Sequence, residues 1–268
     1  MPPIVTDAIV LHVFDYLESS RILKLVTRDA GVRSVLARGA RRSKRRFGAA
    51  LDLFAQGTAE LQIKTGRDLD TLGGFDVRRA RPQLAASLSR FAGANAIAEL
   101  TLRFGGDDMN ADLFDTVAAT LDAIAGAASG GAGDAARDAT LAGAWRVLAD
   151  LGVAPTIDQC AECHGPIDAD APALFSHPAG GVVCARCGHL ARSARTLPPA
   201  ARAALRGWLG DRGDGAVPPP TLDVNDARAH QRLLREFVRE HLADDRPLRA
   251  FENWEQETLM PRAAGGAA

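Results

Sequence analysis

The chain has 268 residues, of which 47% are hydrophobic, and this content can bury a sizeable core and excludes a wholly disordered protein. The formal net charge is −1, with 32 basic and 33 acidic residues. That balance hides an asymmetry, because residues 1–81 hold 15 basic and 9 acidic side chains (+6), which leaves 17 and 24 (−7) for the remainder. A basic first third indicates contact with a polyanion.

Membrane insertion and export are not expected. No stretch of the sequence reaches the ~20 uncharged apolar residues that a membrane span needs. The first residues lack the basic segment of a secretion signal. We therefore expect a cytoplasmic protein with no membrane partner. In that reducing compartment, four cysteines favour metal or redox chemistry over disulfides.

The first 78 residues are expected to form five short β-strands, at 6–13, 21–27, 32–38, 58–65 and 71–77. The fourth alternates between apolar residues such as Ala59 and Leu61 and polar residues such as Glu60 and Gln62, the pattern of a half-buried strand. Five strands in so few residues predict a small closed barrel of the OB type. The strand pattern alone leaves an SH3-like barrel open.

A basic segment falls between the third and fourth predicted strands. Within residues 38–46 there are six cations and no acid, namely Arg38, Arg41, Arg42, Lys44, Arg45 and Arg46. A polyanion stabilises such a density of charge, and guanidinium groups bind phosphate through two parallel hydrogen bonds. Because OB folds present ligands on such connections, we interpret these six residues as DNA contacts. The alternative is a solvated surface loop.

Aromatic residues are scarce in the predicted barrel and are limited to Phe14, Tyr16, Phe47, Phe54 and Phe75. Some of them must fill the core, so an extended base-stacking platform is not expected. Phosphate contacts should dominate, with little sequence preference and a steep salt dependence. A protein that grips phosphates leaves base edges free, so complementary strands can pair while they are bound.

Helical periodicity starts after Arg81. Pro82 suits the first turn of a helix that extends to Phe104, Asn110 can cap a second helix, and a third runs over about 134–151. Residues 126–133, rich in Gly and Ala, form a loop between the last two. Helices resume at 200–209 and 223–242.

All four cysteines lie between these groups of helices, as two C-x2-C pairs separated by 20 residues: Cys160, Cys163, Cys184 and Cys187. Each pair can deliver two thiolates from one tight turn, and two such turns joined by a hairpin make a tetrahedral zinc site. Four sulfurs leave no position for water, so we expect one structural Zn²⁺. Glycines at 165, 180, 181 and 188 stand where such turns need unusual backbone angles.

Alternative interpretations of the cysteines are weaker. Residues 160–164 also spell C-x-x-C-H, a haem attachment signature, but haem attachment needs export and leaves the second pair without a role. His164, His177 and His189 could replace a cysteine as ligands, although four cysteines suffice. No phosphate-binding loop, nucleophile elbow or H-E-x-x-H motif is present in the sequence, and we expect a protein that is not an enzyme.

Blocks of the sequence, in the right order from about 6 to 251, resemble the RecO family of bacterial DNA-repair proteins. In the first part they are 8–11 (AIVL), 18–27 (ESSRILKLVT) and 37–42 (ARGARR), and later 151–155 (LGVAP), the two C-x2-C pairs, 180–184 (GGVVC) and 234–237 (LREF). The loop near residue 130 and the Ala-rich tail depart from the family.

The resemblance implies an α+β, multi-domain fold: an N-terminal OB barrel followed by a helical domain with an inserted zinc module that has four cysteine ligands. We place the barrel at 1–78, the helical domain at 79–157 and 190–260, the module at 158–189 and a flexible tail at 261–268. It also implies a recombination mediator that binds single- and double-stranded DNA, anneals complementary strands and helps load recombinase on coated single strands. Implied partners are RecR and the acidic tail of single-stranded-DNA-binding protein. The residues alone also allow an RNA-binding or transcription or translation factor with a zinc ribbon and an OB fold.

Overall fold

The computed structural model describes residues 3–40, 47, 51–64, 66, 68–128, 134–168, 171, 173–189, 194–210, 222–242 and 246–259. The tail predicted at 261–268 and most of the loop predicted at 126–133 lie outside these residues. The chain divides into two units, Met1–Gly126 and Ala127–Ala268. No helix in the described ranges is long and apolar enough to cross a membrane.

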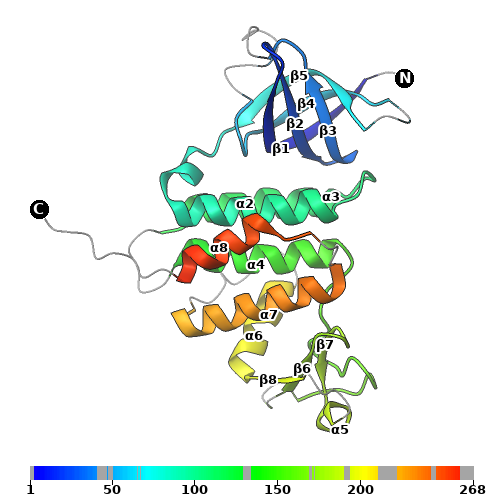
Figure 1. Ribbon diagram of the computed structural model, residues 1–268. Helices are drawn as coiled ribbons and strands as arrows, with labels where there is room; N and C mark the ends of the chain where they lie inside the picture. The colour runs from blue at the N-terminus through cyan, green and yellow to red at the C-terminus, as the bar shows by residue number, and fades with distance from the viewer. Residues whose placement is uncertain are drawn as a thin grey trace, which may run out of the picture. The chain divides into compact units, whose positions relative to one another are not determined.

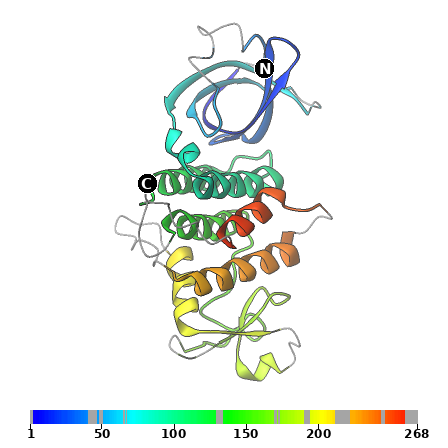
Figure 2. The same cartoon turned by 60° about the vertical axis from the view of Figure 1, so that its left-hand side comes forward.

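Five strands of the first unit close into a barrel, which Figure 2 shows as a ring of strands. They are β1 (Ile4–Tyr16), β2 (Ser20–Thr27), β3 (Gly31–Ala37), β4 (Gln56–Gln62) and β5 (Asp70–Arg79). Their order is β1-β2-β3-β5-β4, and β1 also pairs with β4. The β3–β5 pair is parallel and the others are antiparallel. This is the topology of an OB fold, so the predicted fold is confirmed and the SH3-like alternative is excluded.

The barrel core consists of the inward-facing side chains of alternate residues. The predicted alternation of β4 is confirmed, because Ala59 and Leu61 are fully buried and Glu60 is exposed. Leu23 and Val35 join them from β2 and β3. Each fully buried aliphatic side chain of this size contributes roughly 1.5–3 kcal/mol relative to exposure. The barrel therefore has a hydrophobic core of its own.

Strand β1 is longer than expected and contains a bulge. The register with β2 shifts between Val10 and His12, so one residue, Leu11, is extra. Val10 points into the barrel before the bulge and Val13 packs against the same core after it. A bulge of this kind reverses the phase of the alternation. His12 and Phe14, beyond it, consequently face outward.

The remaining elements of the first unit are η1 (Pro82–Ala86), α2 (Leu88–Phe104) and α3 (Ala111–Gly126) (Figure 1). The single helix predicted from Pro82 to Phe104 is wrong. Ser87 has an extended backbone and its hydroxyl accepts a hydrogen bond from the N–H of Arg90, so a new helix starts there. The predicted cap at Asn110 is confirmed, because its side chain accepts from the N–H of Leu113 at 2.9 Å.

Within this unit, helix α2 packs against β1 and β2, and helix α3 packs against β2. The Arg28 guanidinium on the barrel pairs with both carboxylate oxygens of Asp115 on α3. Gly31 makes the closest approach: its φ is +66°, and a Cβ there would lie 2.4 Å from the carbonyl oxygen of Asp108. A larger residue at this position would push the barrel away from the segment that joins the two helices.

The second unit contains the helices α4 (Ala135–Asp150), α6 (Pro199–Leu209), α7 (Val224–Leu242) and α8 (Arg249–Leu259). The first three agree with the predicted ranges. Helix α8, which buries Phe251 and Trp254 at i, i+3 spacing, was not predicted from the sequence. Two anchors in so short a segment give little periodicity to detect.

A small three-stranded sheet accompanies these helices, with β6 (Ala173–Ser176) between β7 (Gly181–Val183) and β8 (Arg195–Leu197). Strands β6 and β7 form the hairpin expected between the two cysteine pairs. The one-turn helix α5 (Ala185–Gly188) follows β7 directly. One cysteine pair therefore precedes β6 and the other follows β7, so both pairs lie at the open end of this hairpin.

Candidate metal centre and nucleic-acid interface

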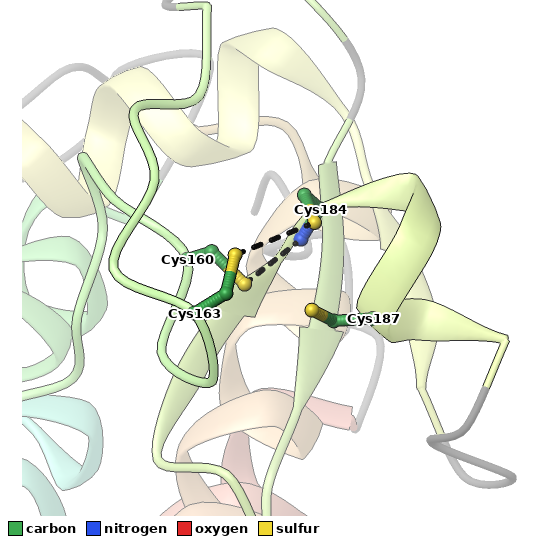
Figure 3. Close-up of side chains that lie close together, drawn as sticks. All are labelled: Cys160, Cys163, Cys184 and Cys187. Atoms are coloured by element: carbon green, nitrogen blue, oxygen red, sulfur yellow. Dashed lines mark hydrogen bonds between the residues drawn. The ribbon is translucent and has the colours of Figure 1, made fainter.

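The four cysteines converge on one point (Figure 3). Their sulfur atoms all lie within 4.8 Å of one another, and those of Cys163 and Cys184 are 3.9 Å apart. A tetrahedral zinc with Zn–S bonds of ~2.3 Å separates its sulfurs by about 3.8 Å. The cluster has the size and donor set of a four-thiolate metal site. Among the described residues it is the candidate cluster for a metal ion.

Two tight turns hold the sulfurs. In the first, the N–H of Cys160 donates to the carbonyl of Gly165, and the N–H of His164 donates back to the carbonyl of Cys160. In the second, Cys184 precedes α5, and its carbonyl accepts from the N–H of Gly188. The N–H of Cys184 also donates to the sulfur of Cys160 at 3.3 Å, which joins the two turns. Figure 3 shows Cys160 and Cys163 on one loop, facing Cys184 and Cys187.

The expected glycine requirements are partly confirmed. Gly180 has a φ of +75°, and at Gly181 a Cβ would lie 2.3 Å from the carbonyl oxygen of Thr156. The prediction for Gly188 is wrong: its φ is not positive, and a Cβ there would clash only with a terminal methyl group of the flexible Leu174 side chain, at 2.3 Å. The prediction for Gly165 is wrong: the left-handed residue of the first turn is its neighbour His164, with a φ of +57°.

The thiols respond unequally to this environment. Burial raises the pKa of Cys160, but the backbone N–H groups of Cys163, Cys184 and Glu162 outweigh it and lower the pKa to about 6. The N–H of Gly165 lowers the pKa of Cys163. The hydrogen bond with Cys184 raises the pKa of Cys187 to about 12. Sulfurs this close to one another share protons when no cation is bound. A metal ion binds thiolates, so it would displace these protons.

Arg202 of α6 holds the first turn by hydrogen bonds to its flanking backbone. Its side chain is fully buried, and its guanidinium donates to the carbonyls of Ile157, Ile167 and Asp168, which flank the first cysteine pair. A buried guanidinium is costly unless its donors are satisfied, and three carbonyls satisfy it here. This role was not predicted, because an arginine on a helix carries no signal of the loop it will bind.

The histidines near the cluster have other partners. His177 lies with its Nε2 3.2 Å from the carbonyl of Leu233, and the Nε2 of His241 lies 2.8 Å from the carbonyl of His177. His164 and His189 lie in the chain beside the cluster, which consists of cysteines alone.

Of the six cations in the basic segment, the structure describes only Arg38. Arg38 is exposed and follows β3 directly. Five of the predicted DNA contacts, Arg41, Arg42, Lys44, Arg45 and Arg46, lie outside the described residues. The segment does connect β3 to β4 of the barrel, as expected.

The five barrel aromatics divide into two groups. Phe47, Phe54 and Phe75 are buried: Phe47 and Phe75 belong to the barrel core, as expected, and Phe54 lies against Phe91 of α2. Phe14 and Tyr16 are 44% and 42% exposed. The sequence pattern did not separate the two groups, because the bulge in β1 decides which residues face outward.

The chain is similar in sequence to proteins described as DNA repair protein RecO. Two family models match, the N-terminal part of recombination protein O over residues 1–81 and its C-terminal part over 85–250. The DNA repair protein RecO of Anaeromyxobacter sp. (strain K) is 36% identical over 247 residues, 91% of this chain and 93% of that protein. The protein of the same description from Geobacter sulfurreducens is 34% identical over 252 residues, 94% and 97% of the two chains. That from Rubrobacter xylanophilus is 32% identical over 239 residues, 89% and 90%.

Proposed function

Because this chain belongs to the RecO family of DNA-repair proteins, we propose that it is a non-enzymatic, DNA-binding recombination mediator. It binds single- and double-stranded DNA through phosphates and anneals complementary strands. It also helps load recombinase on single strands that are already coated. The observation that carries this proposal is an OB barrel whose β3–β4 connection holds six cations in nine residues.

Charge and topology support phosphate contact at this barrel. The first 81 residues carry a formal +6, and the rest of the chain carries −7. OB folds bind oligonucleotides on the face and loops of their strands. Arg38, exposed at the end of β3, stands where the basic segment leaves the barrel. Neutralising phosphates releases counterions, so affinity should fall steeply as salt rises.

We propose that Cys160, Cys163, Cys184 and Cys187 hold one structural Zn²⁺. The thiolate donor set and the tetrahedral spacing fit zinc. Four sulfurs fill its coordination shell, so the ion would supply folding energy to the module and no activated water. Arg202 and the backbone N–H groups that face the sulfurs keep the two turns in place for the ion.

The family relation also supports two protein partners, a RecR-type protein and the acidic tail of single-stranded-DNA-binding protein, and a cytoplasmic location. The domain division is likewise proposed: barrel at 1–78, helical domain at 79–157 and 190–260, zinc module at 158–189. In this division the first compact unit, Met1–Gly126, combines the barrel with the first two long helices.

The deciding experiment is annealing of complementary oligonucleotides, bare and coated with single-stranded-DNA-binding protein. We expect the wild type to anneal both and Arg41→Ala/Arg42→Ala/Lys44→Ala to be impaired. If each cation contacts one phosphate, the logarithmic salt dependence of single-strand binding should flatten by about 2, from ~0.7 for each contact.

The matched control removes three exposed cations from the acidic remainder of the chain, Arg232→Ala/Arg239→Ala/Arg249→Ala. It changes the net charge equally and should leave the salt dependence unchanged. Annealing of neither substrate would contradict the proposal, and equal affinity for RNA and DNA without annealing would favour an RNA-binding or transcription or translation factor instead.

A further inference from the structure

The outer face of β1 and β2 is buried at one end and exposed to solvent at the other. At one end Ile9 and Val26, which pair across the two strands, are buried beside the helices of the same unit. At the other end, beyond the bulge at Leu11, the side chains are exposed. Phe14 is 44% exposed and Tyr16 is 42% exposed. Two large aromatic rings thus stand on a rigid strand with nothing in the described residues covering them fully.

The backbone fixes these rings on one side of the sheet. His12, Phe14 and Tyr16 are alternate residues of β1, so their side chains point to the same side of the sheet. The rings of His12 and Phe14 meet edge to face, with their centroids 4.1 Å apart. Neither Phe14 nor Tyr16 is part of the barrel core. Rigid aromatic rings that project from a strand lose little conformational entropy when a flat ligand stacks on them.

The charged side chains that β1 and β2 carry on this side, and Arg38 after β3, are positive, and the acid Glu18 lies in the turn beyond Tyr16. Lys24 stands opposite His12 on β2, and Arg38 follows β3 at the end of the same face. The only acid between the two rings, Asp15, points to the other side of the strand and pairs with Arg21 at 3.2 Å. Among the described residues of β1–β3 that face outward at this end, there is no carboxylate. The basic segment then continues from Arg38.

We propose that Phe14 and Tyr16 form a base-stacking site for single-stranded DNA. This inference rests on the proposed function and adds to it, because phosphate contacts alone were expected. Single-stranded DNA fits both the exposed rings and the cations of this face. Its flat bases can stack on Phe14 and Tyr16 while its phosphates contact Lys24 and Arg38.

Because it binds by stacking, this face should prefer single-stranded DNA to a duplex. Every base has an aromatic face, so the site tolerates any sequence. The rings cover base faces and leave the pairing edges free, which is compatible with annealing. In a duplex the base faces are already stacked on one another. The site therefore holds single strands, and pairing of the bound strand removes its contact with Phe14 and Tyr16.

Oligonucleotides with and without bases test the proposal directly. We would measure the affinity of the full chain for a thymidine oligonucleotide, an abasic oligonucleotide of the same length, and a duplex. The wild type should bind the thymidine strand on the order of tenfold more tightly than the abasic strand, since one stacked base is worth about 5- to 150-fold. Phe14→Ala/Tyr16→Ala should bind both strands alike, at the abasic level, with duplex affinity unchanged.

Two variants control for shape and folding. Phe14→Tyr/Tyr16→Phe keeps both rings and should keep the preference for bases. Leu17→Ala removes a side chain that is 75% exposed at the tip of the same hairpin and should bind as the wild type does. If Phe14→Ala/Tyr16→Ala retains the wild-type preference for bases, the inference is overturned and this face serves another partner. Absence of binding to all three DNAs by the wild type would instead overturn the proposed function.

A spectroscopic readout is independent of affinity. Tyr16 is the single tyrosine of the chain, so 3-fluorotyrosine labels one position. Its fluorine resonance should shift on addition of the thymidine strand and should not shift with the abasic strand. A shift of equal size with both strands would show that phosphates alone perturb this site, and would overturn stacking.

Discussion

The barrel and the cysteine module are stabilised in different ways. Alternate side chains of five strands form the apolar core of the barrel, with Leu23, Leu61 and Phe75 at its centre. The module has two short strands, β6 and β7, with few buried apolar side chains, and its most buried groups include the thiol of Cys160. The buried guanidinium of Arg202, on the helix α6, holds the first turn of the module. Burial of a charge is costly and is offset only by partners. The barrel can therefore fold on its hydrophobic core, whereas the module depends on its polar centre.

This difference teaches where each region is vulnerable. Loss of a buried side chain in the barrel leaves a cavity, with a cost of a few kcal/mol. Loss of one sulfur in the module removes one of the four groups on which both turns converge. The two kinds of damage should also stay apart, because the barrel and the module belong to different units of the chain.

The largest effect is expected from removal of the proposed metal. Structural zinc supplies ~10–16 kcal/mol in small zinc peptides at neutral pH. Cys184→Ser, or a chelator, should therefore unfold the module locally, which amide hydrogen exchange would detect at residues 173–189. Metal analysis of the purified protein should give one Zn²⁺ for the wild type. Unchanged zinc content and unchanged exchange in Cys184→Ser would show that the ligand assignment is wrong.

A smaller effect is expected in the barrel. Leu23→Ala removes a fully buried side chain from the core and should lower the free energy of unfolding by about 2–5 kcal/mol, measured by denaturant titration. Zinc content should stay at the wild-type value. Leu23→Ala and Cys184→Ser thus serve as controls for each other. Loss of zinc in Leu23→Ala would contradict independent folding of the barrel and the module, because the two regions would then share one folding transition.

The smallest effect is a pH dependence of the second unit. Burial lowers the pKa of His230 to about 4, from 6.5. Between these values the unfolded chain binds a proton that the folded chain does not, so stability falls as the pH falls from 6.5 towards 4. The loss can reach about 3 kcal/mol, from ~1.4 kcal/mol for each pH unit. His230→Gln should flatten the pH dependence of unfolding over this range.

His12→Gln is the matched control in the first unit. Burial, and then Lys24, also lower the pKa of His12, but this side chain is exposed and its substitution should change acid stability much less. His230 belongs to the second unit, so acid should destabilise that unit first. An equal loss of acid sensitivity in both variants would contradict the assignment to His230.

Several features could be predicted before the fold was known. The alternation of Ala59 and Leu61 with polar residues predicted β4, and Asn110 marked the start of α3, because strand periodicity and helix capping depend on neighbours in the chain. The cysteine cluster was also predictable, since each C-x2-C pair closes its own turn. Helix α8 and the helix break at Ser87, which were not predicted, show the limit of these local signals.

The residues that tertiary structure selected are those whose partners are distant in sequence. Arg202 binds carbonyls 34 to 45 residues away, and nothing around it in the chain indicates this. Phe14 and Phe75 are both aromatic residues of barrel strands, yet one is exposed and the other buried. The sequence by itself determined the barrel, most of the long helices and the convergence of the four cysteines, because their patterns are periodic or closely spaced. Only the closed sheet and its bulge decided which rings face solvent, because burial depends on how the strands pair.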